Sequence, residues 1–276
     1  MIPSTGDLRL ARRIVARQGK LLFLGGRDVQ APAAVNQHVH TVYQLTLSNG
    51  ELSGTGSWSQ VASGGKPIWE STAATVVGDK FLFFGGQFNG HTGSSGSASF
   101  EVGLHAFDLS LPTEKPKWYS RGANDNRGVS GAGPSPREDS AMTAIGRFIL
   151  VHGGYSYQKG PCCTSALGYS DCVNIHHNGQ LLGDLWMFDT ENNTWTDLGP
   201  GPPVTVRVTQ TLGIVFPTRP RHQHGMVSLG GKAFLFGGRA STVSPPSPCV
   251  DNCVRDNTAQ DKSLYSFNMT TRYDEI

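Results

Sequence analysis

Short apolar runs that end in a pair of glycines recur four times along the chain. Each run fits one strand of a sheet, because a few consecutive apolar residues bounded by glycine are typical of buried strands. The spacing between successive pairs varies, although the pattern around each pair is kept. Such self-similarity indicates a repeat architecture whose connections differ in length. The glycines of the four pairs are Gly25, Gly26, Gly85, Gly86, Gly153, Gly154, Gly237 and Gly238.

Each unit extends to four predicted strands. An earlier glycine shortly before each pair predicts a strand, a tight turn and then the strand that ends in the pair. Downstream of each pair, an apolar run predicts a third strand, and in the first three units a tryptophan opens a fourth. The unit is therefore expected to be four antiparallel strands. The third strands are predicted at 42–45, 104–108, 185–189 and 264–268.

The glycine pairs and the aromatic residues have physical roles in such a unit. Paired glycines permit backbone φ angles above zero and let a neighbouring chain approach closely. Aromatic side chains on the third and fourth strands can fill the space between adjoining sheets, where they bury a large apolar area. Both features are expected to serve the fold. The aromatic residues in these positions are Tyr43, Trp58, Trp118, Trp186, Trp195 and Tyr265.

The third unit carries a resemblance to a known family. It runs from Phe148 to Gly154 and then from Asp184 through Trp186 to Trp195. An apolar strand, a glycine pair, a later Tyr or Trp and a further Trp resemble the kelch repeat, and the resemblance spans nearly the whole chain. It implies an all-β fold, a kelch-type β-propeller whose blades are arranged radially about an axis.

The resemblance implies four recognisable blades in a single propeller, with the last one incomplete. The second unit has His105 where an aromatic residue is expected, and the fourth reaches Ile276 without a tryptophan. Because kelch propellers usually have more blades, we expect a missing partner strand, a truncated chain, or further blades from a longer chain or another copy. An open sheet edge would favour association. The blades are predicted at approximately 9–61, 70–121, 137–198 and 221–276.

Composition and charge narrow the function classes. With 37% hydrophobic and 16% charged residues, the chain has enough apolar material for a packed core. The formal charge of +2 arises from 23 basic and 21 acidic residues without a basic run, so nucleic acid is not expected as a partner. No apolar stretch is long enough to span a membrane, and no signal peptide is recognisable.

The long connections point to one binding face. Since strands in a blade alternate direction, second-to-third connections and blade-to-blade connections leave from the same face. These connections are longest in the third and fourth units, and binding residues concentrate on loops held by a rigid scaffold. We therefore expect a protein-interaction scaffold with a protein partner; the alternative is that the loops merely lengthened without function. The expected aromatic anchors are Tyr155, Tyr157 and Tyr169.

Two arginines are further candidates for binding. Arg137 and Arg221 each follow a proline and start the innermost strand of a blade. Their guanidinium groups could bind carboxylates of a peptide or acidic ligand bidentately. The structural alternative is pairing with a blade-closing acid such as Asp139.

Cysteine and histidine leave other chemistry open. All five cysteines lie in predicted loops, which favours disulfides, with Cys249 and Cys253 as a natural local pair. Zinc is the rival reading because His176 and His177 follow Cys172, although the spacing fits no familiar zinc finger.

Function has two alternatives besides the scaffold. Some kelch-type propellers are enzymes, including copper oxidases and iron-dependent specifier proteins of plants. The first alternative is therefore a metal-dependent enzyme. The histidine pairs at 38 and 40 and at 222 and 224 are its only support, and no catalytic motif, cofactor or metal site is predicted. A truncated propeller fragment without independent activity is the other. If Met1 is the true start, we expect the protein to be located in the cytosol. If the chain is a fragment with loop disulfides, we expect it to be extracellular.

Overall fold

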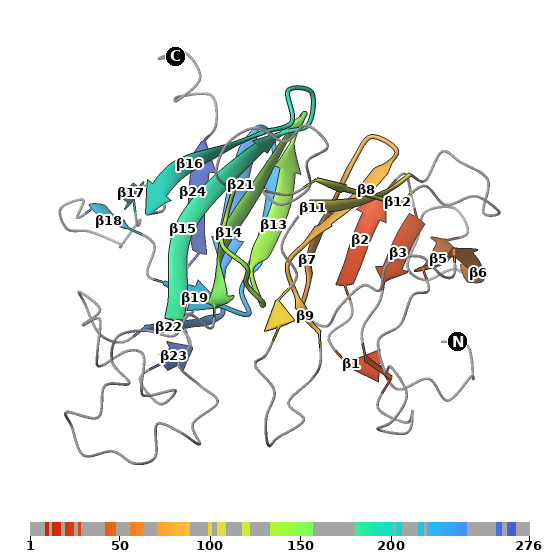
Figure 1. The fold of residues 1–276 in the computed structure, drawn as a ribbon, viewed down its shortest axis with the longest axis horizontal. Helices are drawn as coiled ribbons and strands as arrows, with labels where there is room; N and C mark the ends of the chain where they lie inside the picture. Colours follow the sequence, from red (N-terminus) through yellow and green to blue (C-terminus); the bar gives the residue numbers. More distant parts are fainter. Residues whose placement is uncertain are drawn as a thin grey trace.

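The computed structural model describes a protein built of short antiparallel strands (Figure 1). No helix occurs among the described residues. The described part contains no helix with the length and apolar character needed to cross a membrane. The structure describes residues 9–10, 13–17, 20–24, 27–28, 42–47, 56–62, 71–88, 99–100, 104–108, 118–121, 133–156, 180–200, 203–205, 215–217, 220–241, 258–260 and 264–268.

Four larger sheets carry the repeat. Each begins with a hairpin and continues through a third strand to a fourth, except that the last sheet has three strands among the described residues. The first sheet is β2 (Arg13–Arg17), β3 (Lys20–Leu24), β5 (Val42–Leu47) and β6 (Gly56–Ala62). The second is β7 (Ala73–Val77), β8 (Lys80–Phe84), β11 (Leu104–Asp108) and β12 (Trp118–Arg121). The third is β13 (Ala141–Ile145), β14 (Phe148–Ser156), β15 (Gln180–Asp189) and β16 (Thr194–Pro200). The fourth is β20 (Gly225–Leu229), β21 (Lys232–Phe236) and β24 (Leu264–Asn268).

Short ladders extend the sheets at one end. Two of them pair residues before the first strand of a unit with residues after its glycine pair: β1 pairs with β4, and β19 pairs with β22. The predicted third strands are confirmed, since they coincide with β5, β11, β15 and β24. The short strands are β1 (Arg9–Leu10), β4 (Arg27–Asp28), β9 (Gln87–Phe88), β10 (Ser99–Phe100), β17 (Pro203–Thr205), β18 (Val215–Pro217), β19 (Arg221–His222), β22 (Arg239–Ser241) and β23 (Thr258–Gln260).

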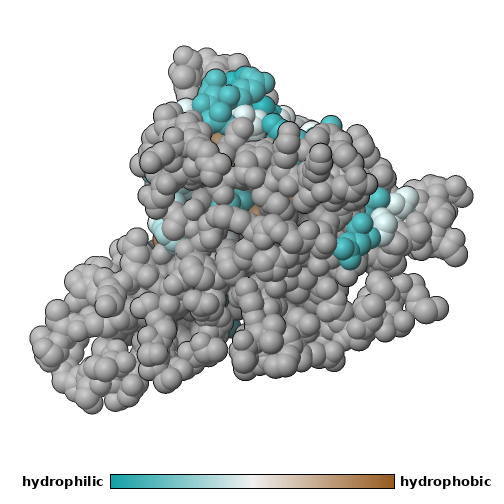
Figure 2. Space-filling model, turned by 45° about the vertical axis from the view of Figure 1, so that its right-hand side comes forward, coloured by the Kyte–Doolittle hydropathy of each residue, from teal (hydrophilic) through white to brown (hydrophobic). Residues whose placement is uncertain are grey.

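The four sheets stack in sequence order. The first strand of each sheet lies beside the first strand of the next, so β2 contacts β7, β7 contacts β13 and β13 contacts β20. One apolar cluster fills each junction, and in the view of Figure 2 the described residues that reach the surface are mainly hydrophilic. Stacking thus buries the apolar face that a single sheet would expose.

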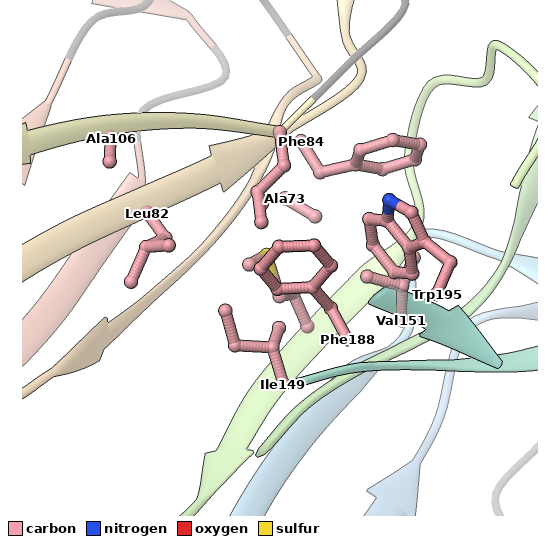
Figure 3. Packing of buried hydrophobic residues seen from close by; sticks show 10 residues of the cluster. Ala73, Leu82, Phe84, Ala106, Ile149, Val151, Phe188 and Trp195 are labelled. Carbon is pink, nitrogen blue, oxygen red and sulfur yellow. The ribbon is translucent and has the colours of Figure 1, made fainter. Parts of the chain in front are cut away.

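The junction between the second and third sheets is the largest cluster. Leu82 and Phe84 of β8 meet Ile149 and Val151 of β14 there. The indole of Trp195 lies against Phe84 with ring centroids 5.7 Å apart, so it joins the two sheets (Figure 3). This is the place that the sequence predicts for aromatic residues of the fourth strand.

The glycine pairs mark where one sheet approaches the next. All described members of the pairs have positive φ, for example 60° at Gly153 and 108° at Gly154. A Cβ at Gly153 would lie 2.7 Å from the carbonyl oxygen of Arg221 in the following unit. The register of β14 also shifts between His152 and Gly154, which bends the strand at this point. Gly25 and Gly26 lie outside the described residues.

Candidate functional site

A left-handed residue precedes the innermost strand in three of the four units. Ser71, Asp139 and Gln223 have φ angles of 59°, 54° and 57°, and each stands 14 residues before the first glycine of its pair. The amide of Asp139 donates to the carbonyl oxygen of Ser71 at 2.9 Å, and the amide of Gln223 donates to that of Asp139 at 3.0 Å. We call this series the inner-strand chain. It links the second, third and fourth sheets through their backbones.

Arg137 is the centre of a buried hydrogen-bond network beside the inner-strand chain. Its Nε donates to the carbonyl oxygen of Ser135 at 2.9 Å, and its Nη2 donates to the Ser135 hydroxyl at 3.0 Å. Its Nη1 donates to the carbonyl oxygen of Gly153 at 3.0 Å. Both terminal nitrogens also contact Asp184, at 2.6 and 2.8 Å. All five donors of the guanidinium are therefore satisfied within the protein.

Arg137 pairs with an acid, as the structural alternative proposes, but this acid is Asp184 on the third strand of the same sheet and not the example Asp139. Burial alone would raise the pKa of Asp184, but the hydrogen bonds and charge of Arg137 lower it below its ordinary value. The indole of Trp186 assists by donating to Asp184 Oδ2 at 2.7 Å. Asp184 is thus held ionised as the bidentate partner of Arg137.

Arg221 repeats part of this arrangement in the next unit. Its Nη1 donates to the carbonyl oxygen of Gly237 at 3.1 Å, 16 residues on, as Arg137 does to Gly153. Neither arginine exposes any surface. Carboxylate binding by Arg137 and Arg221 stays a prediction, and their burial weighs against it.

Two buried histidines meet where the third and fourth sheets join. His152 Nδ1 lies 3.0 Å from His224 Nε2, so one nitrogen carries the proton that the other accepts. Burial, followed by the charges of Arg221 and Arg137, lowers the pKa of His152 to about 3. Burial is also the largest cause that lowers the pKa of His224 well below its usual value. Both rings are therefore neutral at physiological pH.

A smaller polar group beside the histidine pair remains partly exposed. The Oδ2 atom of Asp139 lies 3.5 Å from His222 Nδ1 and accepts a hydrogen bond from Gln223 Nε2 at 3.1 Å. The side chains of His222 and Asp139 are 18% and 15% exposed, and Gln223 is exposed. The ring of Tyr155 packs 5.9 Å from that of His222 and is itself buried. We call Asp139, His222 and Gln223 the inner-strand polar cluster. It offers a carboxylate, an imidazole and an amide to an external polar group.

Several residues predicted from the sequence are not part of this site. Tyr157, Tyr169, Cys249 and Cys253 are outside the described residues, as are the histidines at 38 and 40. Within the residues that the structure describes, no three His, Cys, Asp or Glu side chains are grouped so that they could hold a metal ion. Of the predicted histidines His222 and His224, His224 is in contact with His152 through its Nε2. The structure gives only the backbone of Tyr43 (β5), Trp58 (β6), Trp118 (β12) and Tyr265 (β24).

Sequence reasoning missed the inner-strand chain and the partner of His224. The signal for the inner-strand chain was the fixed offset of Ser71, Asp139 and Gln223 from the glycine pairs. Because the three residue types differ, the sequence does not show them as one repeated position. His152 was visible as the one polar residue directly before a glycine pair. Nothing in the sequence paired it with His224, which is 72 residues away.

Comparison with known proteins agrees with the repeat. Kelch domain-containing protein 3 of Homo sapiens is 25% identical over 173 residues, which are 63% of this chain and 32% of that protein. Kelch domain-containing protein 1 of Mus musculus is 28% identical over 116 residues, 40% of this chain and 24% of that protein. The tRNA wybutosine-synthesizing protein 2/3/4 of Oryza sativa subsp. japonica is 29% identical over 105 residues, 38% of this chain and 7% of that protein. No family model matches the chain.

The fold also has a solved counterpart. The structure of YjhT, a kelch propeller, superposes with a TM-score of 0.52 at 12% sequence identity, over 84% of this chain and 58% of that one. The chain thus spans about a third or less of its curated relatives and little more than half of the solved propeller. With its repeat of glycine pairs and its stacked antiparallel sheets, the chain is similar to kelch domain-containing proteins and shares the fold of a kelch propeller.

Proposed function

We propose that the protein is an interaction scaffold that binds a protein partner at the end of the sheets where β14 and β22 finish and β15 and β23 begin. What supports this is one observation: the buried bonds of Arg137 fix the strand ends beside a partly exposed polar cluster. A site held on rigid elements binds without first having to become ordered. The long connections of the third and fourth units leave from these strand ends (Figure 1).

We further propose that the four stacked sheets are four blades of one propeller domain, the fourth of which has three strands among the described residues. Each sheet corresponds to one unit of the repeat, and the inner-strand chain runs through the last three. The ring would be completed by further blades.

The proposal is tested by replacing the connection at 157–179 with a short Gly-Ser linker. The matched control replaces the turn at 190–193, which joins β15 to β16 at the opposite end of the same sheet. Captured proteins from native extract would be quantified for the intact chain and both variants. A partner bound by the intact chain and the control, but lost from the loop variant, is expected.

The same partner, once purified, should bind through contacts with the inner-strand polar cluster. His222→Ala is expected to weaken its affinity about tenfold, since that factor corresponds to the loss of roughly one good contact of about 1.4 kcal/mol. Equal capture by all three chains, or no capture by a folded intact chain, would overturn the proposed function.

A further inference from the structure

The fourth sheet exposes an apolar face. Val227, Leu229, Phe236 and Leu264 are 51%, 74%, 47% and 64% exposed. Phe236 lies opposite Leu264 in the ladder of β21 and β24, and residues alternate between faces along each strand. These four side chains therefore share one side, which we call the front face of the fourth sheet. On the opposite side, Met226 and Ala233 are buried against the third sheet.

The same positions in the preceding sheets are buried at junctions. Phe84 and His152 stand directly before their glycine pairs, as Phe236 does, and Leu104 and Leu185 pair opposite them, as Leu264 does. All four are at most 3% exposed, and they lie where the next sheet packs. The front face of the fourth sheet thus corresponds to the surfaces of the second and third sheets that are each covered by the following sheet.

The first sheet exposes the complementary side. Ile14, opposite Phe23 in its hairpin, is 56% exposed. The equivalent residues in the third and fourth sheets are Met142 and Met226, opposite Val151 and Leu235, and both are buried against the sheet before. We call the side of the first sheet that carries Ile14 its back face. Every junction inside the molecule joins a front face to a back face.

We propose that a second copy of the chain docks head to tail, with the front face of the fourth sheet of one copy against the back face of the first sheet of the other. Each copy carries both halves of the junction, with four exposed apolar side chains on the front face and Ile14 exposed on the back face. Two copies would supply eight sheets, within the roughly four to eight blades of closed propellers. A single copy covers only 58% of a solved propeller, which is consistent with a ring that one copy does not complete. The surface is separate from the proposed partner-binding end.

The test measures molar mass in solution by sedimentation of the full-length chain. Leu229→Glu places a charge in the front face, and Ile14→Glu places one in the back face. Ser228→Glu is the matched control, because Ser228 is exposed on the same strand but points to the other side. The wild type and the control should sediment at twice the monomer mass, and each face variant at the monomer mass. All three positions are solvent-exposed, and circular dichroism checks that the variants fold.

Mixing the two face variants separates this proposal from others. The Leu229→Glu chain keeps an intact back face and the Ile14→Glu chain keeps an intact front face, so an equimolar mixture should restore a dimer through one junction. Longer wild-type multimers that either variant reduces to monomers would also support head-to-tail docking. A folded wild type that stays monomeric would overturn it. So would an Ile14→Glu chain that still dimerises, because two front faces would then have met.

Discussion

At the scale of single residues, a buried arginine is tolerated because every donor is satisfied. Arg137 has no exposed surface and bonds to Asp184, Gly153 and Ser135. A buried ion pair adds little net stability over an apolar pair, but removing one partner leaves an uncompensated charge inside the protein. The network therefore fixes the geometry of the strand ends more than it adds to the free energy of folding.

Asp184→Asn tests this balance. The substitution keeps the shape of the side chain but removes the charge opposite Arg137. We expect a loss of about 2 to 3 kcal/mol in the free energy of unfolding, somewhat below the range for fully buried pairs because Asp184 is partly exposed. Asp197→Asn, at an exposed position of β16 in the same sheet, should change it by less than about 0.5 kcal/mol. Urea unfolding measures both; equal values would contradict the buried-pair argument.

The histidine pair predicts how stability depends on pH. The pKa of His152 is about 3 in the folded protein and near its ordinary value of about 6.5 in the unfolded chain. Between these values the unfolded chain binds more protons, so stability falls as pH is lowered from 6.5 toward 3. A double variant, His152→Phe with His224→Ser, installs the residues that hold the same two positions at the junction of the second and third sheets, Phe84 and Ser140. Its stability should fall less over this window, by a few kcal/mol. An unchanged pH profile in urea unfolding would contradict this.

At the scale of elements, the glycine pairs connect one unit to the next. Gly153 and Gly146 have nearly the same φ, 60° and 57°, but only Gly153 lies against the following unit. We expect Gly146→Ala to cost about 1 kcal/mol for the left-handed backbone alone. Gly153→Ala should cost at least about 2 kcal/mol more, since its Cβ would meet the Arg221 carbonyl oxygen. Thermal unfolding compares them, and equal losses would contradict the close approach.

The sequence predicts what lies within one unit better than what lies between units. The third strands, the tight turns and the glycine pairs follow from local patterns of glycine and apolar residues. The structural alternative for Arg137, pairing with an acid, names Asp139 as an example, two residues away, because sequence shows neighbours and not the strand that pairs across the sheet. Asp184, 47 residues on, reaches Arg137 only once β14 and β15 have paired. The meeting of His152 and His224 needs two sheets already stacked.

At the scale of the whole molecule, the main contacts between the four described sheets join neighbours in the stack. Stability in such arrays is approximately a sum of unit and junction contributions. The second and third sheets have two junctions each, and they hold Phe81, Leu104, Ile149 and Phe188 with no exposed surface. The fourth sheet has one junction and an exposed front face. The stack is therefore expected to be least stable at its ends.

Hydrogen exchange can resolve this gradient along the chain. In a double variant, Ile14→Glu with Leu229→Glu, neither end face can associate, so a single copy is observed. Amides of β8 and β14 should then exchange most slowly, and those of β3 and β21 at least tenfold faster, because opening an end sheet breaks one junction and opening a central sheet breaks two. In the wild type, docking should slow β3 and β21 while β8 and β14 change little. Uniform protection in the double variant would mean that the sheets unfold as one unit, and would contradict stability built junction by junction.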